Sequence, residues 1–252
     1  MRKKFLAIHP LIGTKHKPSL IHLQQRSPYY WWWAYLRRNA DYIACCERGG
    51  VGELSALYED FGDVRSDDFR SWWGAPNNKG DYLFAEEPLE LSVQKIDAAA
   101  EMKKRWGCNV LYVAVNMDLG RRHLQKKFAD LLQTEHKGKR GRKSLQTAAS
   151  TARYPLHRNY TQHSLKVMLA VYDAVVANDA LPKEQRQPLW AIGESLKLVP
   201  NAMPHKWDNH YDTRKKHATM TMTVSRYVKQ ARAIIANTAK GKFPNSETSQ
   251  LT

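Results

Sequence analysis

The sequence predicts a mainly α protein with a small strand element, an α+β fold class. Most apolar residues recur three or four positions apart, as they do on amphipathic helices. One run, NVLYVAVNM at 109–117, is instead apolar on both parities and β-branched, as a buried strand is. The chain has 252 residues, of which 42% are hydrophobic, so it has the composition of one large or two small globular domains.

The charge is strongly positive and unevenly distributed. The net charge is +16 with a pI of about 9.8, which favours nucleic acid or an anionic surface as a partner. Residues 39–101 carry 14 acidic and 5 basic side chains, whereas 121–158 carry 2 acidic and 11 basic. Residues 205–242 carry 2 acidic and 9 basic. This segregation predicts that only part of the chain faces phosphates, although an acidic protein partner would fit it too.

The first third of the chain is predicted to be an extended arm followed by aromatic helices. Residues 1–28 would pack in places through Phe5, Leu6, Ile8, Leu11 and Ile12. In SPYYWWWAYLRRNADYIACC, Ser27 suits the N-cap and Pro28 the first helical position. Successive tryptophans at 31–33 point three ways around a helix, which predicts burial on more than one side. Stacking of one exposed tryptophan on a base is the alternative.

Shorter helices follow, and each has an end signal. GELSALYEDFGDV predicts a helix that stops at Gly62, and SDDFRSWWG one that Ser66 caps and Gly74 ends. After the predicted strand, residues 118–136 place Leu124, Phe128, Leu131 and Leu132 on one helical face and basic residues on the other.

A basic run, KGKRGRKS at 137–144, suits no packed element, and we expect a linker at 137–143. The expected organisation is an aromatic-rich N-terminal domain over 1–136, a C-terminal domain over 144–244 and a disordered tail over 245–252. Such a run could also follow a DNA backbone, which makes Lys139, Arg140, Arg142 and Lys143 candidate contacts.

Three helical segments are expected in the C-terminal half. Residues 164–178 place Leu165, Met168, Leu169, Tyr172, Val175 and Val176 inward. QPLWAIGESLKLVP at 187–200 has Gly193 directly after an apolar residue, where a small side chain lets a second helix cross closely. In TMTVSRYVKQARAII at 221–235, Thr221 or Thr223 would cap a helix whose apolar face runs from Val224 to Ile235.

These last two segments carry a resemblance. TVSRYVKQAR is similar to the recognition helix of bacterial helix-turn-helix regulators, and LWAIGESLKL to the helix before it. YYWWWAYLRRNADY, VAVNMDLGRR and SRYVKQARAIIANTAKGKFP resemble regulator-like proteins of proteobacterial mobile elements. The resemblance implies a C-terminal helix-turn-helix-like domain that binds DNA. The sequence departs from that pattern because residues 199–220 intervene and Lys197 stands where glycine is common.

The predicted recognition helix leaves polar side chains outward that suit phosphates and base edges. We expect DNA contacts from Thr223, Ser225, Arg226, Lys229, Gln230 and Arg232, with Arg214, Lys215 and Lys216 on the preceding basic segment lying along phosphates. A packing helix with a solvated basic face is the alternative.

No catalytic residue, metal or cofactor is predicted. His205, His210 and His217 fit no zinc spacing, and Asp60, Asp63, Asp67, Asp68 and Asp118 suit helix first turns better than a nuclease site. Adjacent Cys45 and Cys46 indicate buried reduced thiols, and no transmembrane segment or signal peptide is expected. We therefore expect a cytoplasmic protein without membrane contact.

The functional expectation is a DNA-binding protein, a transcriptional regulator or another DNA-transaction factor of a mobile element. Double-stranded DNA is the expected partner, a protein could bind the N-terminal domain, and a homodimer stays open. Two other classes also stay open: an enzyme or defence effector that processes nucleic acid, and a non-catalytic adaptor in a nucleoprotein complex.

Overall fold

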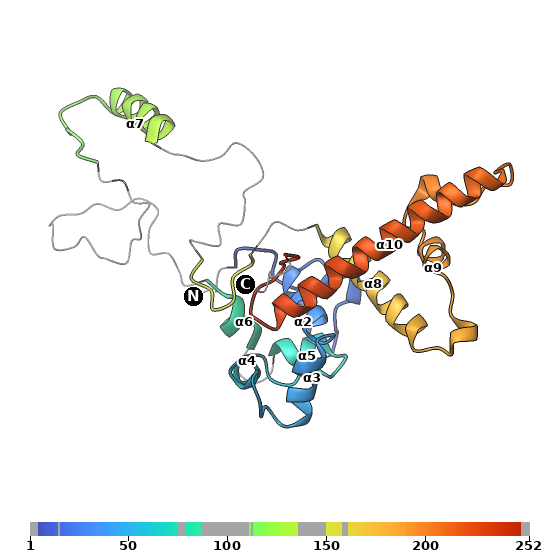
Figure 1. The fold of residues 1–252 in the computed structure, drawn as a ribbon. Coiled ribbons are helices and arrows are strands. Elements are labelled where there is room, and N and C mark those ends of the chain that lie inside the picture. Colours follow the sequence, from blue (N-terminus) through green and yellow to red (C-terminus); the bar gives the residue numbers. More distant parts are fainter. Residues whose placement is uncertain are drawn as a thin grey trace, which may run out of the picture. The chain divides into compact units, whose positions relative to one another are not determined.

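The computed structural model describes residues 5–14, 16–74, 79–86, 111, 113–135, 150–157 and 161–247. Over these residues the protein is mainly α, as predicted (Figure 1). The α-helices are α1 (Ile21–Gln24), α2 (Pro28–Leu36), α3 (Ala40–Glu47), α4 (Ser55–Phe61), α5 (Phe69–Gly74), α6 (Lys79–Phe84), α7 (Arg121–Glu135), α8 (Gln162–Asp179), α9 (Leu189–Ser195) and α10 (His210–Thr238). Two short 3₁₀ turns, η4 (Lys183–Gln185) and η5 (Pro200–Ala202), complete them.

The chain divides into two compact units, and the division differs from the expected one. Residues Met1–Glu87 and Ser144–Thr252 form one unit, and Pro88–Lys143 form the other. The two ends of the sequence share a core because Ile234 and Ile235 of α10, and Phe243 beyond it, are buried in the same cluster as the tryptophans of α2. The expected linker at 137–143 lies outside the described residues and falls at the end of the Pro88–Lys143 unit.

The helix α2 forms the centre of the first unit. It begins as predicted, with Pro28 at its first turn and the Ser27 hydroxyl accepting a hydrogen bond from the Tyr29 amide at 3.3 Å. All three successive tryptophans are buried, the most exposed of them at 4%. None of the three is thus free to stack on a base, and the predicted burial on several sides is confirmed.

The aromatic rings around α2 come from distant parts of the sequence. Trp32 lies 6.0 Å from Phe61 of α4, 5.3 Å from Phe84 of α6 and 5.2 Å from Phe243, measured between ring centroids. The Tyr35 hydroxyl donates to the Leu165 carbonyl of α8 at 3.0 Å, and its burial raises its pKa well above the usual range. Aromatic rings in offset or edge contact at these distances contribute beyond their buried area.

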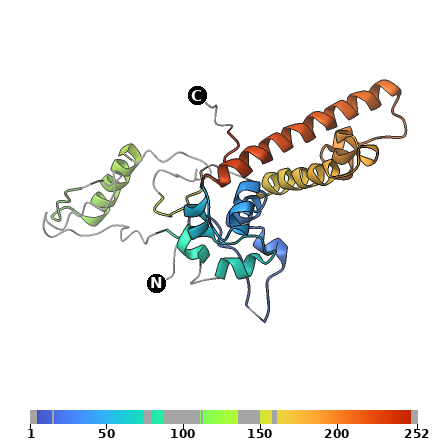
Figure 2. The same ribbon diagram turned by 60° about the horizontal axis from the view of Figure 1, so that its bottom comes forward.

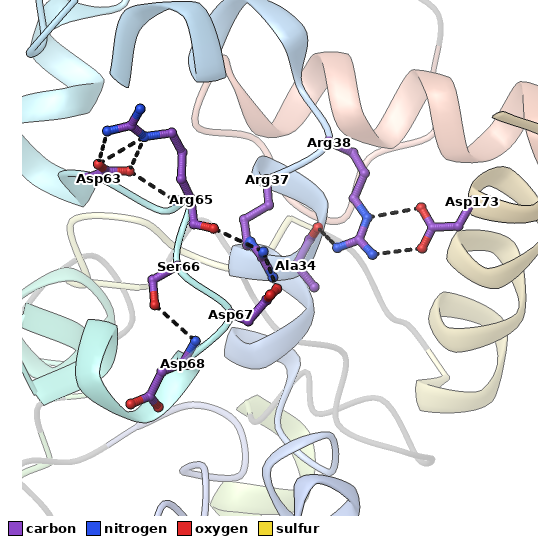
Figure 3. A network of polar contacts seen from close by, with 9 residues as sticks. All are labelled: Ala34, Arg37, Arg38, Asp63, Arg65, Ser66, Asp67, Asp68 and Asp173. Atoms are coloured by element: carbon purple, nitrogen blue, oxygen red, sulfur yellow. Dashed lines mark hydrogen bonds and ion pairs between the residues drawn. The ribbon is translucent and has the colours of Figure 1, made fainter. Parts of the chain in front are cut away.

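Two arginines after α2 fasten it to its neighbours (Figure 3). Arg38 makes a two-pronged ion pair with Asp173 of α8, at 3.1 and 2.7 Å, and also donates to the Ala34 carbonyl at 2.8 Å. Arg37 pairs with Asp67, donates to the Arg65 carbonyl at 3.2 Å and lies over the Trp33 ring. These contacts fix the segment before α5 and the α8 helix relative to α2.

The small helices end where the sequence indicates, but one begins differently. Gly62 follows α4 with a φ of 63°, which a glycine adopts without strain. The helix α5 is capped by Asp68, whose carboxylate accepts hydrogen bonds from the Arg70 and Ser71 amides at 3.0 and 3.1 Å. The expected cap, Ser66, instead accepts a hydrogen bond from the Asp68 amide and lies two residues before the observed cap. Helix α6 was not predicted from the sequence.

The N-terminal arm and the segment at 150–157 both pack on the aromatic core. Of the arm residues expected to pack, Phe5 and Ile12 do, while Leu6, Ile8 and Leu11 are 41–54% exposed. Residues 150–157, where the described part of this unit resumes, are joined to the end of the preceding segment. Buried Glu86 accepts hydrogen bonds from the Ser150 hydroxyl at 2.5 Å and from the Thr151 amide at 2.6 Å.

Helices α8 and α10 lie side by side and run in opposite directions (Figure 2). Leu165, Met168 and Leu169 at the start of α8 share a cluster with Ala231 and Ile234 near the end of α10. Val171 and Val175, further along α8, share a second cluster with Val224 and Val228, earlier in α10. The predicted inward residues are confirmed except that Val171 is buried where Val176, at 45% exposure, was expected.

Helix α9 packs closely on α10, as the small residue predicted. A Cβ placed on Gly193 would lie 2.2 Å from Met220 Cγ and 2.7 Å from its Sδ. The helix ends with Lys197 at a φ of 50°, the Leu198 amide donating to the Gly193 carbonyl at 3.1 Å and the Lys197 amide to Glu194 at 2.9 Å. Lys197 thus occupies a left-handed position that suits glycine.

The predicted buried strand at 109–117 is wrong for the residues that the structure describes. Leu111, Val113, Val115 and Met117 are 39–80% exposed and form no strand. Isolated bridges pair Gly13 with Pro18 and Leu156 with Phe243. A β-branched apolar run forms a strand only where a second strand pairs with it. The helix predicted over 118–136 is confirmed as α7, but it buries none of its residues.

Two further expectations concern the tail and the cysteines. Asn237 donates to the Asn245 and Glu247 carbonyls, at 2.8 Å each, so residues 245–247 are held on α10 and are not disordered. Cys45 and Cys46 are free and buried, as expected. In the described part of the chain, no helix has both the length and the apolarity that crossing a membrane requires.

Candidate nucleic-acid interface

The side of α10 that faces away from α8 and α9 is the candidate interface. Helix α10 begins because the Asn209 side chain accepts a hydrogen bond from the Asp212 amide at 2.8 Å. Its buried residues, from Met220 to Ile235, recur at helical spacing and cover one side. The opposite side is exposed over its length and carries the basic residues Arg214, Lys215, Arg226, Lys229 and Arg232, which we call the basic face.

The basic face holds one sign of charge. The one acidic residue within α10 is Asp212, in the first turn, where a negative charge interacts favourably with the helix dipole. Arg214 and Arg232 are eighteen residues apart, which places them about 27 Å apart along the helix axis. Ser225 is exposed between them. The structure therefore aligns cations from two predicted groups, 214–216 and 223–232, on one straight surface.

Two predicted contact residues make hydrogen bonds within the protein, and a third is only partly exposed. Lys216 is half-buried and its ammonium bonds both Asp208 carboxylate oxygens, at 2.6 and 2.7 Å, and the Met203 carbonyl at 3.1 Å. The Thr223 hydroxyl donates to the Thr219 carbonyl one turn earlier, at 2.9 Å. Gln230 is half-buried. Lys216 thus acts within the fold, and Thr223 and Gln230 are less accessible than Arg226 and Lys229.

The predicted N-terminus of this helix is wrong. Thr221 and Thr223 do not cap a helix, because α10 starts at His210, more than two turns earlier. Residues 223–230 are consequently mid-helix positions, whereas a recognition helix presents its N-terminal residues to the groove floor. The sequence signal for the true start was present in Asn209 with Asp212 three residues later. It was hidden because 210–219 has almost no apolar residues.

Helices α9 and α10 pack together without the tight turn of a helix-turn-helix. Residues 196–209 connect them and include the 3₁₀ turn η5. Their contact is nonetheless specific, since the Trp190 ring stacks on His217 at 3.8 Å between centroids and His217 approaches Glu194 at 3.6 Å. These contacts hold the first half of α10 beside α9.

The remaining candidate residues divide into two groups. Lys139, Arg140, Arg142 and Lys143 lie outside the described residues. Three of the five acids considered for a nuclease site are engaged elsewhere: buried Asp60 bonds Arg153 at 2.8 Å and the Tyr154 hydroxyl at 2.6 Å, Asp63 pairs with Arg65 at 2.6 Å, and Asp67 pairs with Arg37. Burial and the Asp60 carboxylate both raise the pKa of Tyr154. Over the residues that the structure describes, no three His, Cys, Asp or Glu side chains gather as metal ligands would.

Sequence reasoning missed one feature beside the basic face. Trp207 and Tyr211 are 76% and 72% exposed, next to the basic residues at the start of α10. The clustered tryptophans at 31–33, by contrast, are buried.

Comparison with protein-family models, with curated proteins and with solved structures gave no match.

Proposed function

We propose that this chain binds double-stranded DNA through the basic face of α10, as a transcriptional regulator or another DNA-transaction factor of a mobile element. The observation that carries the proposal is the run of five exposed cations along one side of a single helix with no acid among them. A duplex presents about one negative charge per 1.7 Å of its axis with both strands counted, so 27 Å of duplex carries about sixteen phosphate charges, and the basic face would meet those on the side turned toward it.

Nearby acids do not neutralise this face. Asp173 pairs with Arg38 at 2.7 Å, Asp208 with Lys216 at 2.6 Å, and Glu194 lies 3.6 Å from His217. Each of these carboxylates is held by a partner away from the exposed cations. Asp212, in the first turn of α10, is the remaining acid close to this face, and the face keeps a net positive charge.

The geometry favours contact with phosphates over contact with base edges. A bare helix is about 10–12 Å across and fits the major groove, which is about 12 Å wide. Helix α10 is not bare, because α8 and α9 cover its apolar side along most of its length (Figures 1 and 2). Only the outward side of α10 can face DNA, and the side chains exposed there are mainly long cations, so contacts with the phosphate backbone are the expected ones. Binding should accordingly depend little on sequence.

Replacing Arg226 and Lys229 together tests the proposal. Both side chains are exposed, and Arg226 also lies over the ring of Tyr227, 5.4 Å from its centroid. In fluorescence anisotropy with labelled duplexes at about 0.1 M salt, Arg226→Ala/Lys229→Ala should bind at least about tenfold more weakly. The loss should be the same on duplexes of unrelated sequence, because phosphates carry no sequence information.

A matched control removes the same charge from another surface. Lys166 of α8 and Lys183 of η4 are exposed and lie outside α10. Lys166→Ala/Lys183→Ala should bind nearly as well as the wild type. Equal losses in the two double variants would mean that net charge alone attracts DNA and that α10 is not the contact.

A further inference from the structure

The turn before α10 holds the side chain of Trp207 exposed to solvent. Residues 205–208 form a turn closed by the Asp208 amide donating to the His205 carbonyl at 2.9 Å. The Asp208 carboxylate accepts a hydrogen bond from the His205 amide at 2.7 Å. Lys216 then bonds that carboxylate and the Met203 carbonyl from inside α10. The turn is thereby fixed to the helix, and Trp207 at its corner is held outward.

Trp207 stands apart from the other described tryptophans. Trp31, Trp32, Trp33, Trp72 and Trp73 are at most 6% exposed, and Trp190 stacks on His217. Trp207 at 76% and Tyr211 at 72% are the most exposed aromatic side chains in the described part of the chain. The two lie four residues apart, so their Cα atoms are separated by no more than about 14 Å.

Basic residues surround this pair. The Lys206 ammonium lies 4.7 Å from the Trp207 ring centroid, and Arg214 and Lys215 are exposed one turn after Tyr211. Of the two nearby acids, Asp208 is engaged by Lys216, whose hydrogen bond lowers the Asp208 pKa, and Asp212 is half-buried in the first turn. Exposed rings among cations are the chemistry that holds unpaired nucleotides, the rings stacking on bases while the cations meet phosphates.

We propose that Trp207 and Tyr211, with Lys206, Arg214 and Lys215, form a site for unpaired DNA bases at the end of the basic face. The site rests in part on the proposed function, because Arg214 and Lys215 belong to both. A duplex lying along α10 would place an adjoining single-stranded tail at Trp207. The preferred ligand is therefore a junction between duplex and single strand, not a blunt duplex.

The test compares two labelled DNAs on the full chain at about 0.1 M salt: a blunt duplex, and the same duplex with a single-stranded oligothymidine tail. The wild type should bind the tailed DNA more tightly. Trp207→Ala should lose at least about fivefold in affinity for the tailed DNA and keep its affinity for the blunt one. Trp207→Phe should retain most of the gain and Trp207→Leu should not, because leucine keeps apolar area but has no ring to stack.

Tyr82→Ala serves as the matched control, since Tyr82 is 55% exposed on α6 and also lies beneath a cation, Arg153. It should bind both DNAs as the wild type does. The proposal would be overturned if the wild type bound the two DNAs with equal affinity, or if Trp207→Leu bound the tailed DNA as tightly as the wild type does. Trp207-dependent binding to anionic phospholipid vesicles with no gain from the tail would overturn it too, because exposed tryptophan, tyrosine and lysine also suit a membrane interface.

The two proposals fail separately in this experiment. Weaker binding of the blunt duplex by Arg226→Ala/Lys229→Ala would support the basic face and would not test the aromatic site. A wild type that binds only the tailed DNA, through Trp207, would contradict duplex binding and support the aromatic site.

Discussion

Lys197 shows how a single backbone angle limits stability at the end of α9. Its φ of 50° lies in the left-handed region, which costs a residue with a Cβ roughly 1–2 kcal/mol. The hydrogen bonds from the Lys197 and Leu198 amides back into α9 require this conformation. Lysine therefore occupies a position at which glycine would be relaxed.

We predict that Lys197→Gly stabilises the protein by about 1 kcal/mol, since it removes that strain without changing the hydrogen bonds. The melting temperature followed by circular dichroism should rise by about 2–4 °C. Ser195→Gly, at an exposed residue with ordinary helical angles, should lower it instead. A lower melting temperature for Lys197→Gly would show that the lysine side chain contributes more than its backbone costs.

His157 gives stability a dependence on pH. Burial, followed by the nearby Lys242 charge, lowers its pKa below the usual value of about 6.5. The unfolded chain then binds the proton more readily than the folded one, so this contribution is complete above about pH 6.5 and is lost as the pH falls below it.

We predict that His157→Gln flattens the fall in melting temperature between about pH 7 and pH 5, measured on both proteins in matched buffers. Parallel curves for the wild type and His157→Gln would contradict this assignment and place the acid sensitivity in other groups.

At the scale of elements, the contact of α9 with α10 depends on the absence of a side chain at Gly193. Met220 is wholly buried, and its side chain lies against that position. This contact holds α9, and with it the path of the chain toward the turn at 205–208.

Gly193→Val should lower the free energy of unfolding by about 2 kcal/mol, because the new methyl groups overlap Met220 and Val224. Urea titration measures this directly. Gly74→Val is the control, since a Cβ there meets nothing within 4 Å. If the two variants lose equal stability, the effect comes from replacing glycine in general and not from this helix contact.

Sequence signals were sufficient where the physics is local. Ser27 with Pro28 marked the start of α2, Gly62 marked the end of α4, and the apolar spacing from Val224 to Ile235 marked the buried side of α10. Each depends on neighbours in the chain that the sequence displays.

Signals failed where the outcome depends on distant partners. The apolar run at 109–117 predicted a strand, but its described residues have no strand to pair with. The start of α10 was placed too late because its first turns pack little. The exposure of Trp207 could not be separated from the burial of Trp32, since a tryptophan in a sequence does not reveal which rings surround it.

For the whole molecule, the shared core implies that the first unit unfolds as one. Trp32 contacts rings from α4, α6 and residues 154 and 243, and Ile234 and Ile235 of α10 lie in the same cluster. Independent domains over 1–136 and 144–244 would instead separate the stability of α2 from that of α10.

Trp32→Ala should therefore cost about 3–5 kcal/mol and reduce amide hydrogen-exchange protection in the second half of α10 as much as in α2. Trp207→Ala, which removes an exposed ring, should change neither. Full protection of α10 in Trp32→Ala would indicate two independently stable parts.

The salt dependence of binding measures whether the basic face of α10 contacts DNA phosphates. The affinity of the wild type and of Arg226→Ala/Lys229→Ala would be measured on one duplex across a series of salt concentrations. Each phosphate contact contributes about 0.9 to the slope of log affinity against log salt, so the double variant should have a slope shallower by about 2. A steep slope that is the same in both proteins would contradict the claim and move the DNA contact to another surface.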